Sequence, residues 1–236
     1  MTAKTMWDRL AGKRVCFGHQ SVGADMMNEL SALGDGRLDI VESCDPEDFQ
    51  RPVFAHFRVG ENRDPQSKCR AFAQVIDNGV GAQVDIALFK FCYVDITAGT
   101  DVDELFQTYQ GIMNSLSHRY PKVGFFHVTV PLRQVGDGWL GWLREKSGRF
   151  DQERDNQIRR HLFNQKLRSA YGTSGRLFDL AKEEATYPDG RSACFRHRGE
   201  AVPNLVSAYT DDGGHLNRQA AKDIAGRLLA CLSAVD

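Results

Sequence analysis

The sequence predicts an α/β protein in which a five-stranded parallel sheet is covered by helices on both faces. Short apolar runs alternate along the chain with longer amphipathic segments, which is the pattern of βαβ units. The chain has 236 residues, of which 42% are hydrophobic, so it can bury a sizeable core. We therefore expect a single domain that spans residues 1–236.

Short apolar runs mark the expected strands. They are Arg14–Phe17, Leu38–Val41, Val84–Phe89, Val123–Val130 and Arg176–Leu180. In a parallel sheet, the loops that leave the carboxyl ends of the strands converge on one edge, where ligands bind. The loop after the second run is expected to be long and to contain "RVGENRDP", residues 58–65.

The segments between these runs, and the last segment of the chain, have the periodicity of amphipathic helices. The expected helices are Val22–Leu33, a helix from Pro65 to about Ile76, Asp101–His118, Gln152–Tyr171 and Asn217–Ser233. In the fourth helix we expect Ile158, Leu162, Leu167 and Ala170 to face inward. Residues 131–149 and 183–211 are too irregular for such elements, and loops of this length are commonly functional.

The composition argues against several classes of partner and site. The 30 basic and 31 acidic residues nearly cancel, so neither a nucleic acid nor a membrane surface is an expected partner. The chain contains no apolar stretch of membrane-spanning or signal-peptide length, and it is expected to be cytoplasmic. The six cysteines form no C-x-x-C pair and no H-x-x-x-H spacing occurs, so neither a disulfide framework nor a metal or other cofactor is expected.

An aspartate and a histidine lie together before the last predicted helix. Asp212 and His215 are separated by two glycines in "TDDGGHLN", residues 210–217. A carboxylate in such a turn can accept a hydrogen bond from Nδ1 of the imidazole, which leaves Nε2 free to take a proton from a hydroxyl. The alternative is a surface histidine beside a helix-capping aspartate.

Ser21 lies in "GHQSVG", at the junction of the first strand and the first helix. Amide groups at the start of a helix point outward and can stabilise an oxyanion. Because serine is inert as a nucleophile without a base, Ser21 and the histidine before the last helix are expected to act together. The alternative is that Ser21 only caps the helix.

The serine after the first strand, the glycine in the second loop and the D-x-x-H before the C-terminal helix resemble the SGNH/GDSL hydrolase superfamily. The order of these motifs matches, and the resemblance spans residues 13–232. It implies a flavodoxin-like three-layer α/β/α fold and hydrolysis of carboxylic esters through a serine acyl-enzyme. It also implies that Ser21 is the nucleophile, His215 the general base and Asp212 its orienting acid. The amides of Ser21 and Gly60 would then form the oxyanion hole.

The chain departs from this family at two motifs, so we expect it to be a divergent branch. It reads G-H-Q-S where G-D-S is usual, which places Gln20 before the serine. It reads "FKFCYVD", residues 89–95, where G-x-N-D is usual, so the asparagine that normally donates to the oxyanion is missing. Asn62, beside Gly60, is the expected substitute, and Lys90 or Tyr93 are less natural ones.

Further polar and aromatic residues near these motifs are expected to contact the substrate. They are His19, Gln20, Lys90, Tyr93, Trp139 and Trp142. The tryptophans fit stacking on a sugar or an acyl group, and they equally fit one amphipathic turn that covers the core. The expected partner is therefore a small-molecule or carbohydrate ester.

Two other functions remain open at the level of the sequence. One is a non-catalytic, ligand-binding member of the same fold, because fold does not fix function. The other is a hydrolase in which Cys92 is the nucleophile, although the alternation in "ALFKFCYV" favours a buried thiol there. His127, inside an apolar run, is expected to be a hydrogen-bonded core or rim histidine.

Overall fold

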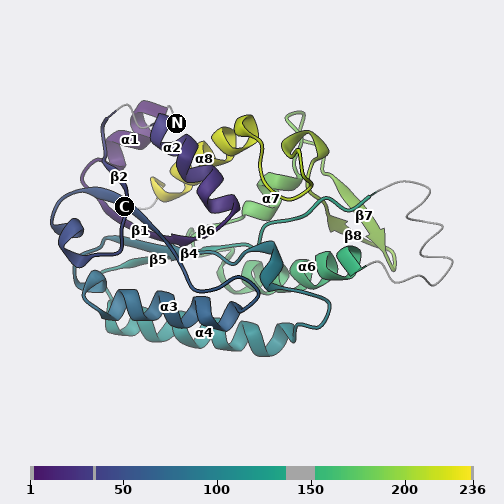
Figure 1. Ribbon diagram of the computed structural model, residues 1–236, viewed down its shortest axis with the longest axis horizontal. Coiled ribbons are helices and arrows are strands. Elements are labelled where there is room, and N and C mark those ends of the chain that lie inside the picture. The colour runs from purple at the N-terminus through teal and green to yellow at the C-terminus, as the bar shows by residue number, and fades with distance from the viewer. Residues whose placement is uncertain (1–2, 34–35, 137–151, 235–236) are drawn as a thin grey trace.

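A six-stranded, all-parallel sheet forms the centre of the computed structural model, which describes residues 3–33, 36–136 and 152–234 (Figure 1). The strand order is β2-β3-β1-β4-β5-β6. The strands are β1 (Arg14–His19), β2 (Ile40–Glu42), β3 (Val53–Arg58), β4 (Ile86–Phe89), β5 (Gly124–Val128) and β6 (Leu177–Phe178). The α/β class is confirmed, whereas the predicted count of five strands is wrong by one.

The strand that the sequence analysis missed is β3. It lies between β1 and β2 and pairs with β1 along its whole length, from Arg14↔Val53 to His19↔Arg58. Its apolar residues are buried, but His56 and Arg58 interrupt the apolar run that would have identified it. The loop that contains "RVGENRDP" therefore follows β3 and not β2, which brings it directly beside the end of β1.

Helices cover both faces of the sheet (Figure 1). The first face carries α1 (Ala3–Leu10), α2 (Val22–Leu33), α7 (Leu180–Ala185) and α8 (Arg218–Leu232), and residues of all four pack in one apolar core. The opposite face carries α3 (Pro65–Asp77), α4 (Val102–Arg119) and α6 (Gln152–Tyr171), around a second core. This is the predicted three-layer α/β/α arrangement.

Short elements complete the structure. The 3-10 helices are η1 (Pro46–Gln50), η2 (Val80–Ala82), η3 (Tyr93–Asp95) and η4 (Ser207–Tyr209). The strands β7 (Cys194–His197) and β8 (Glu200–Pro203) form an antiparallel hairpin at one end of the molecule (Figure 1). The hairpin and the end of α7 lie in residues 183–211, for which the sequence predicted no regular elements. α7 begins at Leu180, which the prediction had placed at the end of a strand.

Side-chain caps explain where several helices begin. The carboxylate of Asp64 accepts from the amide of Ser67 at the start of α3, and the side chain of Asn217 accepts from Ala220 at the start of α8. At the start of α4, Asp101 accepts from the first-turn amides of Asp103 and Glu104. Each cap satisfies amides that have no partner within the helix.

The buried face of α6 differs from the prediction. It consists of Gln157, Arg160, Phe163, Asn164 and Leu167, whereas Leu162 is 37% exposed and Ala170 is exposed. Polar side chains can take the inward positions because they replace backbone partners, as where Asn164 bonds both the N–H and the C=O of Val130. Leu167 is buried as predicted and Ile158 packs partly buried against a small cluster, so the apolar pattern identified only part of this face.

The structure also describes the cysteines and His127, which the sequence analysis had discussed. All six cysteines are free, and three of them, Cys16, Cys69 and Cys92, are buried. His127 is buried and bonds the hydroxyl of Tyr109 through Nδ1 at 2.8 Å, as expected of a satisfied core histidine. Among the described residues, no helix is both long and apolar enough to cross a bilayer.

The revised face of α6 can be tested with two leucines of that helix. Leu167→Ala should lower the free energy of unfolding by about 2–5 kcal/mol, because the side chain is fully buried and leaves a cavity. Leu162→Ala should change it by less than about 1 kcal/mol, since the side chain is partly in solvent. Urea denaturation measures both, and equal losses would restore the originally predicted stripe.

Candidate functional site

A cavity of about 490 Å³ lies at the carboxyl edge of the sheet, where the loops after β1, β3 and β4 meet. It brings together Ser21, Asn62, Tyr93 and His215, which are far apart in the sequence. The remaining lining residues are His19, Gln20, Ala24, Asn28, Glu42, His56, Arg58 and Val94. Of the residues predicted to contact the substrate, Trp139 and Trp142 lie outside the described residues.

Ser21 occupies a strained position immediately before α2. Its φ is +55°, in the left-handed region, which a residue other than glycine seldom adopts and which costs about 1–3 kcal/mol. A capping serine has extended dihedrals and bonds a first-turn amide. The Ser21 side chain instead interacts with the phenol of Tyr93, which lowers the pKa of that phenol against the effect of burial. The geometry is therefore that of a turn that presents the hydroxyl to the cavity.

The turn before α8 joins His215 to Asp212. Nδ1 of His215 lies 2.5 Å from one carboxylate oxygen of Asp212, and the other oxygen accepts from the amides of Gly214 and His215. The hydrogen bond from the imidazole holds the pKa of the Asp212 carboxyl well below its usual range. Because this carboxylate can only accept, Nδ1 carries the proton and Nε2 is left as the acceptor.

Tyr93 lies between the serine and the histidine. Its hydroxyl interacts with the side chain of Ser21 and lies 3.5 Å from Nε2 of His215. The rings of Tyr93 and His215 meet edge to face at 5.9 Å between their centroids. Tyr93 is the first residue of η3, in the loop after β4.

Gln20 joins the serine turn to the loop after β3. Its side-chain amide donates to the carbonyls of Val59 and Gly60, at 2.9 and 2.6 Å. Gly60 has a φ of +53°, and a Cβ there would lie 2.6 Å from the amide nitrogen of Lys68, so only glycine fits. Among the described residues, the N–H groups of Ser21 and Gly60 have no protein acceptor.

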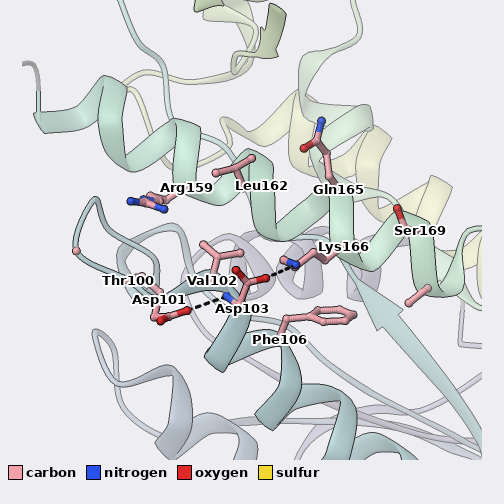
Figure 2. Close-up of a pocket in the computed structure, with 12 residues that line it drawn as sticks. Thr100, Asp101, Val102, Asp103, Phe106, Arg159, Leu162, Gln165, Lys166 and Ser169 are labelled. Carbon is pink, nitrogen blue, oxygen red and sulfur yellow. Dashed lines mark hydrogen bonds and ion pairs between the residues drawn. The ribbon is translucent and has the colours of Figure 1, made fainter.

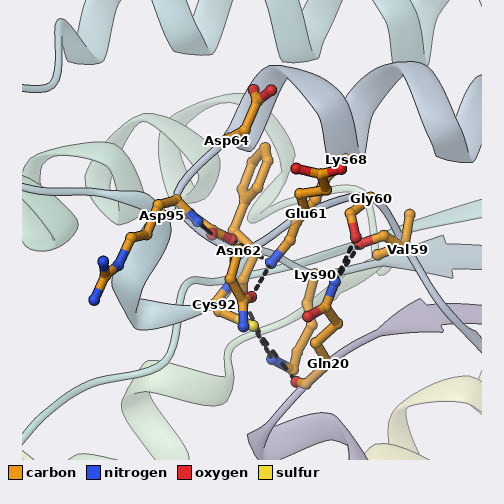
Figure 3. Close-up of polar contacts among 12 residues, drawn as sticks. Gln20, Val59, Gly60, Glu61, Asn62, Asp64, Lys68, Lys90, Cys92 and Asp95 are labelled. Carbon is orange, nitrogen blue, oxygen red and sulfur yellow. Dashed lines mark hydrogen bonds and ion pairs between the residues drawn. The ribbon is translucent and has the colours of Figure 1, made fainter.

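Asn62 presents an amide donor to the cavity. Its Oδ1 accepts from Nζ of Lys68 at 2.9 Å, and its nitrogen points away from the lysine (Figure 3). Since an ammonium group only donates, this contact fixes which end of the amide is oxygen. The NH₂ group is therefore the end that is available to a ligand.

Lys68 and Asp95 form a buried ion pair that organises both loops (Figure 3). Both side chains are 0% exposed and Nζ lies 2.6 Å from Oδ2. The carboxylate also accepts from the amides of Cys92 and Arg63, at 2.6 and 2.8 Å. One carboxylate thus fixes the loop after β4 and the loop after β3, and its partner lysine orients Asn62. The sequence analysis did not identify this pair.

Three other predicted candidates have surroundings that limit their roles. His19 is 3% exposed, and burial together with the charge of Lys90 lowers its pKa to about 2, so it is unsuited to act as a base at neutral pH. Lys90 is 1% exposed and donates to the carbonyl of Phe91, so it is not placed to contact a substrate as predicted. The thiol of Cys92 is buried and faces the carbonyl of Gln20.

Several cavity residues were missed because β3 was missed. His56 lies beside His19, with 3.1 Å between their ring nitrogens, and burial lowers its pKa. Arg58, at the end of β3, and Glu42, at the end of β2, place opposite charges on the same wall. The alternating run that ends at Gly60 could have identified this strand and hence its polar residues.

A larger hollow of about 990 Å³ lies between the start of α4 and α6 (Figure 2). An ion pair between Asp103 and Lys166 crosses it, and Leu162 lies on its rim. It is lined by none of the residues of the serine cavity. Within the described part of the chain, no group of three histidine, cysteine or acidic residues is arranged to hold a metal ion.

Comparison with known proteins gives a likeness in structure and none in sequence. No family model and no curated protein matches the chain. A solved structure from Streptococcus pneumonia, described under the name platelet activating factor, has a TM-score of 0.53 and 16% identity, with 96% of this chain and 91% of that chain covered. This level of identity shows the fold alone. The chain shares the overall α/β fold of that structure.

Two further solved structures are similar at lower scores. A lipolytic protein of the G-D-S-L family from Desulfitobacterium hafniense has a TM-score of 0.47 and 9% identity, over 93% of this chain and 98% of that one. The periplasmic domain of a lipopolysaccharide acetyltransferase from Salmonella ser. Paratyphi A has a TM-score of 0.49 and 9% identity, over 94% of this chain and 84% of that one.

The ion pair beneath the cavity can be tested through stability. Lys68→Met should lower the free energy of unfolding by about 3–5 kcal/mol, because it leaves the Asp95 carboxylate buried without its counter-ion. Lys166→Met, which removes the exposed pair with Asp103, should cost less than about 1 kcal/mol. Denaturant unfolding compares the two, and similar losses would contradict the central place of Lys68.

Proposed function

We propose that the chain hydrolyses carboxylic esters through a serine acyl-enzyme. The observation that carries this proposal is the convergence of a strained Ser21 and a carboxylate-bound His215 on one cavity. Strained backbone at a cavity is retained where the rest of the structure compensates for it and function uses it. The α/β fold that the chain shares with a solved structure does not depend on this activity.

The proposed reaction begins with attack of the Ser21 hydroxyl oxygen on the ester carbonyl carbon. His215 accepts the serine proton through Nε2, and Asp212 stabilises the resulting imidazolium through Nδ1. The tetrahedral intermediate then expels the alcohol, which takes the proton back from His215. Water attacks the acyl-enzyme by the same sequence of steps and releases the acid.

Donors for the oxyanion come from two loops. The amides of Ser21 and Gly60 and the side-chain amide of Asn62 are the proposed donors, because they have no other protein acceptor among the described residues. Two of them are held in place before substrate arrives. Gln20 donates to the Val59 carbonyl of the peptide that carries the Gly60 N–H, and Lys68 donates to Asn62. Preorganised donors of this kind contribute about 2.7–4 kcal/mol each to transition-state stabilisation.

The cavity wall indicates a polar substrate. Glu42, Arg58, Asn28 and His56 face the same space as Ser21, and a wall of this kind solvates hydroxyl or charged groups better than a long acyl chain. We therefore propose an acetyl or other short acyl ester of a polar alcohol, with carbohydrate esters included. The buried thiol of Cys92, which does not line the cavity, does not favour a cysteine nucleophile.

The nucleophile is tested by substitution and by covalent labelling. Ser21→Ala should abolish hydrolysis of p-nitrophenyl acetate and labelling by a fluorophosphonate, because both need an activated serine. Ser31→Ala, on an exposed position of the same helix, should leave both unchanged. A folded wild-type chain that neither hydrolyses the ester nor reacts with the probe would instead be a binding protein.

The role of Asn62 is tested by the loss of its amide donor. Asn62→Ala should lower kcat by about 100- to 1000-fold with a smaller change in KM, because an oxyanion forms only in the transition state. Asn28→Ala, which truncates another amide on the cavity wall, should act mainly on KM. A change in KM alone for Asn62→Ala would reassign this residue to substrate binding.

A further inference from the structure

Among the described residues, no hydrogen bond joins Ser21 directly to His215, and the phenol of Tyr93 contacts both side chains. We propose that Tyr93 is a further catalytic residue, which relays the serine proton to Nε2 of the histidine. This inference rests on the proposed serine hydrolase function and changes its first step. The usual arrangement of a serine and histidine in direct contact is replaced by three groups in series.

The direction of the hydrogen bonds follows from Asp212. Its carboxylate accepts from Nδ1 of His215, so Nε2 carries no proton and can only accept. The Tyr93 hydroxyl, which faces Nε2, must therefore be the donor to it. A phenol has one proton, so its contact with Ser21 is one in which the serine donates. Each donor in the series thus points toward the histidine, which is the arrangement that a proton relay needs.

The surroundings of Tyr93 hold the phenol in this position. The residue is 8% exposed, and its carbonyl accepts from Nε of Arg160 at 2.7 Å. The guanidinium carbons of Arg133 and Arg160 lie 5.2 and 5.9 Å from the centre of its ring. At Gly214, a Cβ would lie 3.0 Å from the Tyr93 hydroxyl, so the histidine turn approaches this phenol closely only because glycine is there.

The same surroundings suit the charge that a relay develops. Burial raises the pKa of the Tyr93 phenol, so the group is neutral at pH 7 and has its proton available to donate. When this proton moves to His215, the guanidinium groups of Arg133 and Arg160 offset the negative charge that builds on the phenol oxygen.

The relay step balances in atoms and electrons. As the serine oxygen forms its bond to the carbonyl carbon, the carbonyl π electrons move onto the oxygen. The serine proton passes to the phenol oxygen and the phenol proton passes to Nε2 of His215, so Tyr93 is neutral before and after. The reverse shift returns a proton to the leaving alcohol oxygen when the intermediate collapses.

Tyr93→Phe tests the relay because it removes only the hydroxyl. We expect kcat for p-nitrophenyl acetate and the rate of fluorophosphonate labelling to fall by about 100-fold, with KM changed less than about threefold. Tyr109→Phe is the matched control, since it removes a buried hydroxyl that also bonds a histidine but lies in the core on the opposite face of the sheet. It should label at the wild-type rate.

A proton inventory separates a relay from a structural role. A relay moves two protons in the acylation step. When the wild-type rate is measured in mixtures of H₂O and D₂O and plotted against the fraction of deuterium, the plot should therefore be curved. The residual rate of Tyr93→Phe should follow a straight line. A linear inventory in the wild type would overturn the relay.

The remaining outcomes distinguish the two proposals. Wild-type labelling rates in Tyr93→Phe, with no labelling in Ser21→Ala, would overturn the relay and leave the esterase proposal intact. Absence of labelling in the folded wild type would overturn both. If Tyr93→Phe does not fold, 3-fluorotyrosine at this position serves instead. The more acidic phenol should move the alkaline limit of labelling to lower pH, and an unchanged profile would overturn the relay.

Discussion

The ion pair between Lys68 and Asp95 is the interaction on which the cavity depends. Burying two charges costs several kcal/mol each, and such a pair is tolerated only where further hydrogen bonds satisfy both partners. Here Asp95 also accepts amides from two loops, and Lys68 also donates to Asn62. The carboxylate of Asp95 thus fixes the loops after β3 and β4. The ammonium group of Lys68 fixes the side chain of Asn62 at the cavity.

The parallel sheet makes this arrangement possible. Because β3 lies on one side of β1 and β4 on the other, the loops that follow all three strands end at the same edge. Gln20, which precedes Ser21, then reaches the Gly60 loop with two hydrogen bonds. These contacts, together with the amides of Ala24 and Asp25 that bond the Ser21 carbonyl, offset the strain of the serine turn.

The elements that could be predicted from the sequence are those with a regular pattern of apolar residues. α2, α4 and α8 have regular apolar stripes, and their bounds were predicted to within a residue or two. β3 was missed because His56 and Arg58 break its apolar run, and these same residues line the cavity. Lys68 lies on the apolar stripe of α3 with Phe72 and Ile76, and a cation in that position requires a buried counter-ion. Its partner, Asp95, is distant in sequence and only the fold brings it close.

The two histidines nearest to Ser21 explain why a relay would be useful. His19 lies only two residues from the serine, but burial beside Lys90 makes its imidazolium too unstable for it to accept a proton at neutral pH. The imidazolium of His215 is stabilised by Asp212 and by solvent, since its side chain is 46% exposed. Among the described residues, His215 makes no direct hydrogen bond with Ser21, and the phenol of Tyr93 contacts both. In the proposed relay, the phenol of Tyr93 joins Ser21, a strained and half-buried nucleophile, to His215. His215 is the base, and its positive charge depends on solvent and on the carboxylate of Asp212.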